Sequence, residues 1–416
     1  MLDKIDFHTD VLVVGGGMAG TMAALAAARM GARVILVERH TAVGGMATMG
    51  LVQPITMWGN REHYVGGGLG RRILEELAEH KGAGDMNTYG PVCDSEALKF
   101  ELEKRLLADN VEILYQAWVN GVETDNGEIR AVTAVAKEGT LRFKPKMVVD
   151  ASGDADVAAL AGVPWDEGRQ GATLMMTMAG IDWQRVPENA NDIFRSHNDA
   201  TYRGLLSFRH PTRRDAAFFN CTEVDQLAAL DTRELTRAIV ECRRQAWRIL
   251  EICRLHVPGF EQAYIEQTAP ALGVRESRRI RGLYCLDEHD VMSGREFPDA
   301  IARCICPVDV HGDESKQGGK RYVALKKSYA IPYRTMIAKE VKNLIVTGRP
   351  ISCDQAAHSS LRRMAPGCSL GEAAGIAAAM AVEAAASADA RTVDVDVLRR
   401  YLLDNGAVLH PEPIAE

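Results

Sequence analysis

Three glycines near the start of the chain have the spacing of a dinucleotide-binding loop. Gly15, Gly17 and Gly20 lie in the run VLVVGGGMAG, after an apolar stretch and at the start of a predicted helix. In such a loop the first glycine makes a tight turn, the second lets the backbone approach a pyrophosphate, and the third allows close helix–strand packing. Glu38 closes the next apolar run, where a carboxylate can accept hydrogen bonds from ribose hydroxyls. The pattern favours nucleotide binding over a merely tight structural turn.

A second group of residues could exchange protons and bind anions. His358 lies in DQAAHSSLRR, and histidine titrates near neutral pH. Arg362 follows four residues later, so the two side chains share a face if the segment is helical. A fixed guanidinium can bind a carboxylate or a phosphate through two hydrogen bonds. Two interpretations of His358 stay open: a proton-exchanging group beside a cofactor, or a solvated loop histidine.

Alternating strand and helix patterns around these residues predict an α/β fold. Residues 10–14, 18–30 and 33–37 form a β–α–β unit of the size that a parallel crossover needs. The run 111–152 alternates polar and apolar residues and carries turn signals, which predicts a small antiparallel meander ending in a buried strand at 147–151. Near the end, KNLIVTGR and the small-residue helix GEAAGIAAAMAVEAAA restore the Rossmann-like character.

The cofactor-binding domain is therefore expected to be discontinuous. From about residue 171, arginine, aspartate and aromatic residues become denser, and strands mix with a long predicted helix over 232–255. We predict a Rossmann-like cofactor domain with an inserted α+β substrate domain. The expected division is 1–60, 95–170 and 325–395 for the cofactor domain, 61–94 and 171–324 for the substrate domain, and 396–416 for a C-terminal helix and tail.

Two further stretches favour FAD over NAD. A glycine loop, RHTAVGGMATMG, follows Glu38 where an NAD dehydrogenase usually proceeds to the next crossover, and VVDASGD ends a late strand. With these, GVRESRRIRGLYCLDEHDV and the segment from YAIPYRTM to GCSLGEAAGIAAAMA, the chain resembles FAD-dependent oxidoreductases of the glutathione-reductase-like fold. That group is related to succinate dehydrogenase and fumarate reductase flavoproteins and to heterodisulfide reductase subunits. Residues 183–265 have no counterpart that can be assigned.

The resemblance implies non-covalent FAD held by all three pieces of the domain. Gly15, Gly17 and Gly20 would hold the pyrophosphate, and Glu38, with Arg39 beside it, the adenosine ribose. The other implied contacts are Gly45, Met46 and Ala47 near the ribityl chain or the ring, Gly153 and Asp154 on the adenosine side, Gly348 and Arg349 at a late strand end, and Gly371 and Gly375 at the start of the final helix. The N-terminus of that helix would stabilise negative charge on reduced flavin.

The resemblance also places Arg275 on the substrate side, so His358, Arg362 and Arg275 are the candidate catalytic residues. For its neighbours Arg278 and Arg279, a surface charge run is at least as good an interpretation. The nine cysteines form no C-x-x-C, which fits reduced structural thiols, and no metal site is expected.

The composition and net charge of the chain indicate which classes of protein and partner to expect. With 416 residues, 47% hydrophobic and 25% charged, the chain has the composition of a globular protein. A net charge of −7 gives no electrostatic footprint for nucleic acid. No apolar run approaches the roughly 20 residues of a transmembrane helix, and the N-terminus does not look like a secretory signal. We expect a cytoplasmic protein with a small-molecule substrate, and a homo-oligomer is left open.

These observations predict an FAD-dependent oxidoreductase that acts on a small polar organic substrate by hydride transfer to or from flavin N5. The electron acceptor or donor stays unknown, because the chain has no second glycine loop of this type and no iron–sulfur spacing. The alternatives are a non-redox flavoprotein of isomerase, lyase or hydratase type, a flavoprotein subunit of a larger redox complex, and an NAD-dependent dehydrogenase.

Overall fold

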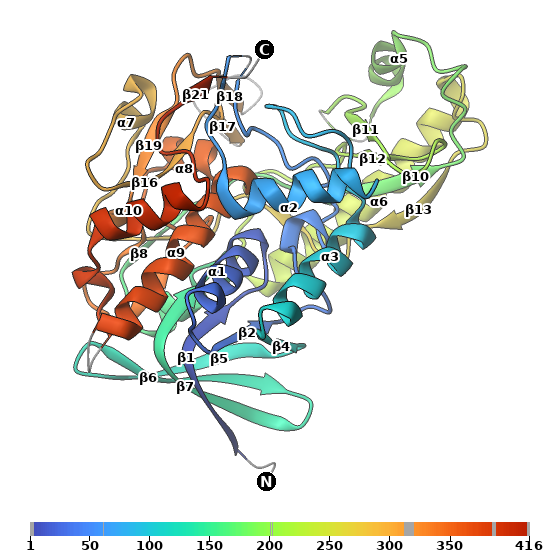
Figure 1. Cartoon of the computed structure of the whole chain (residues 1–416). Helices are drawn as coiled ribbons and strands as arrows, with labels where there is room; N and C mark the ends of the chain where they lie inside the picture. The colour runs from blue at the N-terminus through green and yellow to red at the C-terminus, as the bar shows by residue number, and fades with distance from the viewer. Residues whose placement is uncertain are drawn as a thin grey trace.

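The largest sheet of the structure has seven strands and lies below helices α1 (Met18–Arg29), α2 (Gly68–Glu79) and α9 (Met364–Ala384) in the view of Figure 1. The computed structural model describes residues 4–60, 62–199, 201, 203–311, 320–384 and 388–413. Five neighbouring strands run parallel, in the order β4 (Glu112–Tyr115), β2 (Val34–Glu38), β1 (Lys4–Val14), β7 (Gly139–Asp150) and β20 (Leu344–Val346). The apolar runs of β1, β2, β7 and β20 are buried, as a sheet covered on both faces requires, whereas β4 at the edge is only partly buried. The strands predicted at 10–14, 33–37 and 147–151 are confirmed.

An antiparallel meander extends the sheet on one side. Strands β5 (Trp118–Asp125) and β6 (Glu128–Ala136) pair with each other, and β6 pairs with the first half of β7. The turn between β5 and β6 is Asn126-Gly127, and both residues have positive φ, as a tight two-residue hairpin turn requires. The predicted meander is confirmed for these strands. Its expected first strand, β4, instead pairs parallel with β2.

Helices α1 (Met18–Arg29) and α9 (Met364–Ala384) pack together on one face of the sheet. The predicted start of the last helix at Gly371 is wrong, because α9 begins at Met364 with Pro366 in its first turn, where a missing N–H is tolerated. Gly371 and Gly375 lie inside the helix. A Cβ at these positions would come within 2.0 Å of the Ala19 oxygen and 2.1 Å of the Ala23 oxygen. Both glycines therefore allow close approach of the two helices.

The small residues of α9 serve packing inside the protein. Among the described residues it is the one helix long and apolar enough to cross a bilayer, but 89% of its most apolar window is buried. Helices α2 (Gly68–Glu79), α3 (Ser95–Ala108) and α10 (Val395–Asp404) complete this side. Leu398 and Leu402 of α10 lie in the same core as α1 and α9.

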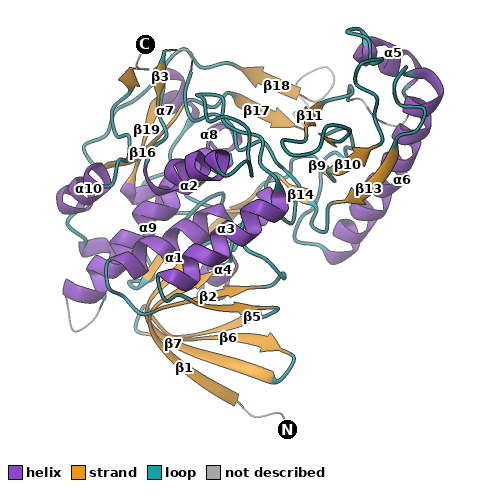
Figure 2. Ribbon diagram, turned by 45° about the vertical axis from the view of Figure 1, so that its right-hand side comes forward, coloured by secondary structure: helices purple, strands orange, loops and turns teal. Residues whose placement is uncertain are grey.

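The inserted segment forms a second sheet with its own core, apart from the large sheet (Figure 2). Its antiparallel strands are β11 (Ser207–Arg209), β12 (Ala217–Phe219), β10 (Met176–Ala179) and β13 (Tyr264–Thr268). Helices α5 (Ala190–His197) and α6 (Thr232–His256) pack beside it, and α6 confirms the long helix predicted over 232–255. Asp231 caps α6 by accepting hydrogen bonds from the N–H groups of Arg233 and Glu234.

The remaining elements of the structure are short. They are η1 (Gly45–Ala47), β3 (His63–Tyr64), α4 (Asp156–Leu160), β8 (Trp165–Glu167), β9 (Ala172–Thr173), β14 (Gly273–Val274), β15 (Arg278–Ile280), α7 (Glu288–Ser293), β16 (Ala300–Cys304), β17 (Val308–His311), β18 (Lys320–Val323), β19 (Tyr329–Pro332), η2 (Tyr333–Met336), α8 (Gln355–Leu361), η3 (Ala390–Thr392) and β21 (Glu412–Pro413). Strand β16 pairs with β19 and packs on α9. The predicted domain boundaries stay a prediction, and the boundary at 324/325 lies between these paired strands.

Candidate active site

Two glycines of the glycine loop leave no room for a side chain, and the third faces open space. Gly15 has φ +97°, and a Cβ there would lie 2.4 Å from the carbonyl oxygen of Ala151. A Cβ on Gly20 would lie 1.8 Å from the oxygen of Gly15. A Cβ on Gly17, the N-cap of α1, would meet nothing within 4 Å. The loop therefore leaves open space at the helix N-terminus, where N–H groups and the helix dipole favour a phosphate.

Glu38 ties the second strand to this loop. The N–H of Gly16 donates to Oε2 of Glu38 at 2.6 Å, and the N–H of His40 donates to Oε1 at 2.7 Å. A carboxylate has about four acceptor positions, so Glu38 can still accept from ribose hydroxyls. A cleft beside it, at the ends of β1 and β2, is lined by Gly15, Glu38, Arg39, Trp118, Ser152 and Asp156, among others.

Arg39, Asp154 and Arg349 form one charged cluster next to the cleft. The guanidinium of Arg39 lies 5.1 Å from the ring centre of Trp118 and 3.9 Å from the carboxylate of Asp154. Asp154 also accepts from Arg349 and, at 2.6 Å, from Ser277. Burial would raise the pKa of Asp154, but Arg349 and its other partners hold it below its usual value. These side chains join three chain segments, and their contact with the cofactor stays a prediction.

The loop after Glu38 lies directly on the glycine loop. The N–H of Gly44 donates to the oxygen of Gly16 at 2.7 Å, and a Cβ on Gly45 would lie 2.8 Å from Cα of Gly17. Gly45, Met46 and Ala47 form the single turn η1. The structure thus brings together the predicted pyrophosphate residues and the residues predicted to run along the rest of the cofactor. Gly348, which follows β20 and was also predicted to contact the cofactor, has φ +79° and lies beside Ala19 of α1.

Gln53 is a candidate that the sequence does not reveal. Its side chain is fully buried, and neither its oxygen nor its nitrogen has a hydrogen-bond partner within the described part of the chain. Leu51, two residues earlier, packs in the core of the inserted segment. A buried amide without partners costs about 1–3 kcal/mol, so Gln53 is a candidate for hydrogen bonding to a ligand. No motif signals this, because glutamine in a loop is usually solvated.

His358 is fully buried in α8, so its interpretation as a solvated loop histidine is wrong. Neither ring nitrogen has a hydrogen-bond partner among the described residues, and Nδ1 lies 3.8 Å from Oε1 of Glu276. Burial, with Arg362 and Arg279 nearby, lowers its pKa well below the ordinary value. The imidazole is therefore neutral near pH 7, and both of its nitrogens are available to a ligand.

Arg362 and Arg275 lie close to each other and are largely buried. Arg362 ends α8, and its Nη2 donates to the carbonyl oxygen of Asp309 at 3.2 Å. Arg275 donates to the carbonyl oxygen of Gly171. Burial lowers the pKa of Arg275 to about 10 and that of Arg362 well below its usual range. The shared face predicted for His358 and Arg362 fits the helical bond from the N–H of Arg362 to the oxygen of His358.

The neighbouring arginines are not a surface charge run. Arg279 lies 2.9 Å from Oε1 of Glu276 and donates to the oxygen of Cys353. Arg278 donates at 2.9 Å to Asp156 and also bonds the backbone of Asp154. The surface interpretation of these two residues is therefore wrong, because both join the inserted segment to the parallel sheet.

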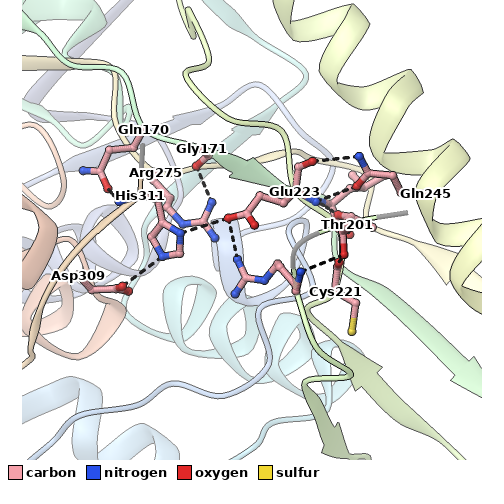
Figure 3. A network of polar contacts seen from close by, with 12 residues as sticks. Gln170, Gly171, Thr201, Cys221, Glu223, Gln245, Arg275, Asp309 and His311 are labelled. Atoms are coloured by element: carbon pink, nitrogen blue, oxygen red, sulfur yellow. Dashed lines mark hydrogen bonds and ion pairs between the residues drawn. The ribbon is translucent and has the colours of Figure 1, made fainter. Parts of the chain in front are cut away.

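A polar network extends from this cluster into the inserted segment (Figure 3). His311 links two carboxylates, with Nδ1 3.2 Å from Glu223 and Nε2 3.2 Å from Asp309. Glu223 lies 3.4 Å from Arg203 and is also held by Gln245. In Figure 3, Arg275 lies between Gly171 and the side chain of Glu223.

Comparison with known proteins identifies the group to which this site belongs. A family model described as FAD dependent oxidoreductase matches residues 10–402. The chain belongs to this family. Its cofactor is FAD, which confirms the choice of FAD over NAD and the resemblance from which the site was predicted. The free side of Gly17 and the cleft at Glu38 fit that cofactor.

Individual proteins that are similar to this chain match it over shorter stretches than the family model does. The chain is 28% identical over 151 residues to the tRNA uridine 5-carboxymethylaminomethyl modification enzyme MnmG of Desulfitobacterium hafniense, covering 34% of this chain and 23% of that one. It is 33% identical over 184 residues to 6-methylpretetramide 4-monooxygenase of Streptomyces rimosus, covering 38% and 42%. The chain thus spans less than half of either relative.

A solved structure aligns along nearly the whole chain. It is a geranylgeranyl bacteriochlorophyll reductase-like protein from Thermoplasma acidophilum, with 14% identity, a TM-score of 0.49, and coverage of 97% of this chain and 85% of that one. The assignment of the fold to the FAD-binding Rossmann type rests on the strand order and the glycine loop of this chain.

Proposed function

We propose that this FAD-dependent oxidoreductase oxidises or reduces a small polar organic molecule by hydride transfer to or from flavin N5. The substrate would bind where the inserted segment meets the parallel sheet. The observation that carries this proposal is that His358 and Arg362, both of α8, lie near Arg275 of the inserted segment, and that all three side chains are largely buried. FAD, when bound, supplies two-electron chemistry to such a site.

Each of the three side chains supports a distinct role. His358 is neutral and without a hydrogen-bond partner among the described residues, so it can accept a proton from a bound substrate or return it. Arg362 is held at Asp309, and Arg275 at Gly171, so each guanidinium has a fixed direction for binding a polar group. Burial of all three excludes water, which strengthens their electrostatic effect.

The test is an anaerobic titration of the FAD-loaded protein with small polar compounds, followed in the visible flavin band. We expect at least one compound to bleach the band in the wild type and to do so more slowly in a His358→Ala variant. If a compound is converted without any lasting bleaching, the non-redox alternative is supported and the proposal is wrong. If only a partner protein restores turnover, the protein is a subunit of a larger redox complex.

Hydroxylation is a second candidate, supported by the names of two relatives. Both the 6-methylpretetramide 4-monooxygenase and the aklavinone 12-hydroxylase DnrF of Streptomyces peucetius are 33% identical to this chain over their matched residues. In that case NADH or NADPH, not the organic substrate, would bleach the flavin. Oxygen uptake that depends on both the nicotinamide and the organic compound would then favour hydroxylation.

A further inference from the structure

The buried polar cluster contains more positive than negative groups. Within the described residues, five guanidinium groups are linked by contacts or lie close together: Arg203, Arg275, Arg279, Arg362 and Arg363. Three carboxylates face them: Glu223, Glu276 and Asp309. Burying a charge without a partner costs several kcal/mol, so such an excess indicates that an anion completes the site.

Arg275 carries most of this imbalance. Its one hydrogen bond to the described residues goes to the neutral carbonyl of Gly171, and no carboxylate of that set lies within ion-pair distance. Only 9% of the surface of Arg275 is accessible, so its positive charge is largely removed from water. A guanidinium has five N–H donors, and most of those of Arg275 are therefore available to a ligand.

Arg362 has a carboxylate neighbour, but it shares that neighbour. Oδ2 of Asp309 lies 3.5 Å from Nη2 of Arg362 and 2.9 Å from Nη2 of Arg363, while its Oδ1 lies 3.2 Å from His311. The shorter contact belongs to Arg363, and Nε of Arg362 has no hydrogen-bond partner in the described part of the chain. The carboxylate of Asp309 is therefore shared by His311, Arg362 and Arg363. Of the two arginines, Arg362 is the less well paired.

The excess positive charge of Arg275 and Arg362 lies apart from the glycine loop, where the cofactor phosphates are expected. No residue of the glycine loop or of the cleft at Glu38 contacts Arg275 or Arg362 among the described contacts. On the cofactor side, Arg349 and Arg278 are already paired with Asp154 and Asp156. The phosphates of FAD therefore do not account for Arg275 and Arg362.

A cavity lies at the other end of the same network. It measures about 380 Å³ and is lined by Asn191, Arg195, Arg203, Leu205, Leu206 and His311. This volume suits a small organic molecule. Glu223 connects the cavity wall to the cluster, because it contacts both Arg203 and His311 and lies near Arg275 (Figure 3).

We propose that Arg275 and Arg362 bind the anionic group, a carboxylate or a phosphate, of an organic substrate where the inserted segment meets the sheet. The inference rests on the proposed function and specifies its substrate class. The two guanidinium groups hold the anionic end through paired hydrogen bonds, and the cavity with its polar and apolar walls takes the remainder of the molecule. His358, on the same helix as Arg362, lies beside the bound molecule.

The test is isothermal titration calorimetry of the FAD-loaded protein at constant ionic strength. The titrants are succinate, benzoate and inorganic phosphate, with succinamide and benzamide as neutral counterparts. We expect at least one anion to bind and its neutral counterpart not to bind, and the preferred anion distinguishes a carboxylate site from a phosphate site. Arg275→Met and Arg362→Met should each weaken binding about tenfold or more. Arg243→Met, which changes an exposed residue of α6, is the matched control.

Equal binding of acids and amides overturns the proposal, as does an anion affinity that Arg275→Met leaves unchanged. If a methionine variant does not fold, Arg275→Lys replaces it, because lysine keeps the charge and loses the planar fork. If both Arg275→Lys and Arg362→Lys bind the anion as tightly as the wild type does, the proposal of paired hydrogen bonds is wrong.

The outcome is separable from that of the proposed function. Anion binding that depends on Arg275, with no compound able to reduce or reoxidise the flavin, contradicts the proposed redox function and supports the anion site. A neutral compound that bleaches the flavin equally well in wild type and Arg275→Met contradicts the anion site alone.

Discussion

The imidazole Nδ1 of His358 lies 3.8 Å from Oε1 of Glu276, and both side chains are fully buried. The other carboxylate oxygen of Glu276 accepts from Gln170 at 3.0 Å and from Gln355 at 3.3 Å. Glu276 is thus fixed by Gln170, Gln355 and Arg279, and His358 lies beside this carboxylate without a direct hydrogen bond. This arrangement leaves both nitrogens of the imidazole available to a ligand, while burial and the nearby arginines keep its pKa low.

We predict that His358→Ala slows flavin reduction by substrate about 100-fold or more while FAD stays bound, because general acid–base groups contribute on this scale. The measurement is the rate of anaerobic bleaching, together with the flavin content of the purified variant. His289→Ala, an exposed position in α7, is the control. An unaltered rate of reduction would remove His358 from the active site.

Replacing Glu38 by alanine should weaken FAD binding roughly 10- to 150-fold, the effect of losing hydrogen bonds to a charged group. The affinity is measured by titrating FAD into the apoprotein. Glu112→Ala, an exposed change in the neighbouring strand β4, should leave it unchanged. If the Glu38 variant keeps its flavin through purification and dialysis as the wild type does, the carboxylate does not hold the ribose.

Gly371→Ala should lower the free energy of unfolding by about 1–3 kcal/mol, because the added Cβ would force α1 and α9 apart. The matched control is Gly367→Ala in the same helix, where a Cβ meets nothing within 4 Å. The control should be neutral or stabilising by about 0.5–1 kcal/mol. Denaturant unfolding of the apoproteins measures both. Equal effects of the two substitutions would contradict the close packing of the helices.

Glu372 should make stability depend on pH. It is buried in α9, where Oε2 accepts from the N–H of Leu69 at 2.9 Å, and burial raises its pKa to about 7. Because the folded pKa lies above the unfolded one, its contribution is fully present below about pH 4.5 and is lost as pH rises through 7. Glu372→Gln should therefore be the more stable protein at pH 8 by roughly 2–3 kcal/mol, and the difference should vanish at pH 4.5. A difference that is the same at both pH values contradicts a buried, titrating carboxylate.

The glycine loop and the parallel strands could be predicted from the sequence because their physics is local. Gly15, Gly17 and Gly20 follow a buried strand, and the spacing alone dictates a tight turn at a helix start. Glu38 was predictable for the same reason. The start of α9 was missed because MAPGCSL contains a proline and a glycine, and only its position in the first turn makes the proline harmless.

The chemistry of the buried cluster could be predicted only in part. Histidine and arginine at positions 358 and 362 were visible as a pair, but their surroundings include Glu276 and Asp309, which lie 82 and 53 positions away in the sequence. Gln53 carries no sequence signal at all, because its buried, unpartnered amide exists only in the folded chain. Asp309 and His311, which organise the arginines, were missed for the same reason.

The most direct test of the account is the flavin content of the purified protein. We predict a yellow protein that releases FAD on denaturation in a stoichiometric amount, or an apoprotein that takes up FAD and gains the visible flavin band. A colourless protein that binds no added FAD would contradict the cofactor assignment and everything inferred from it.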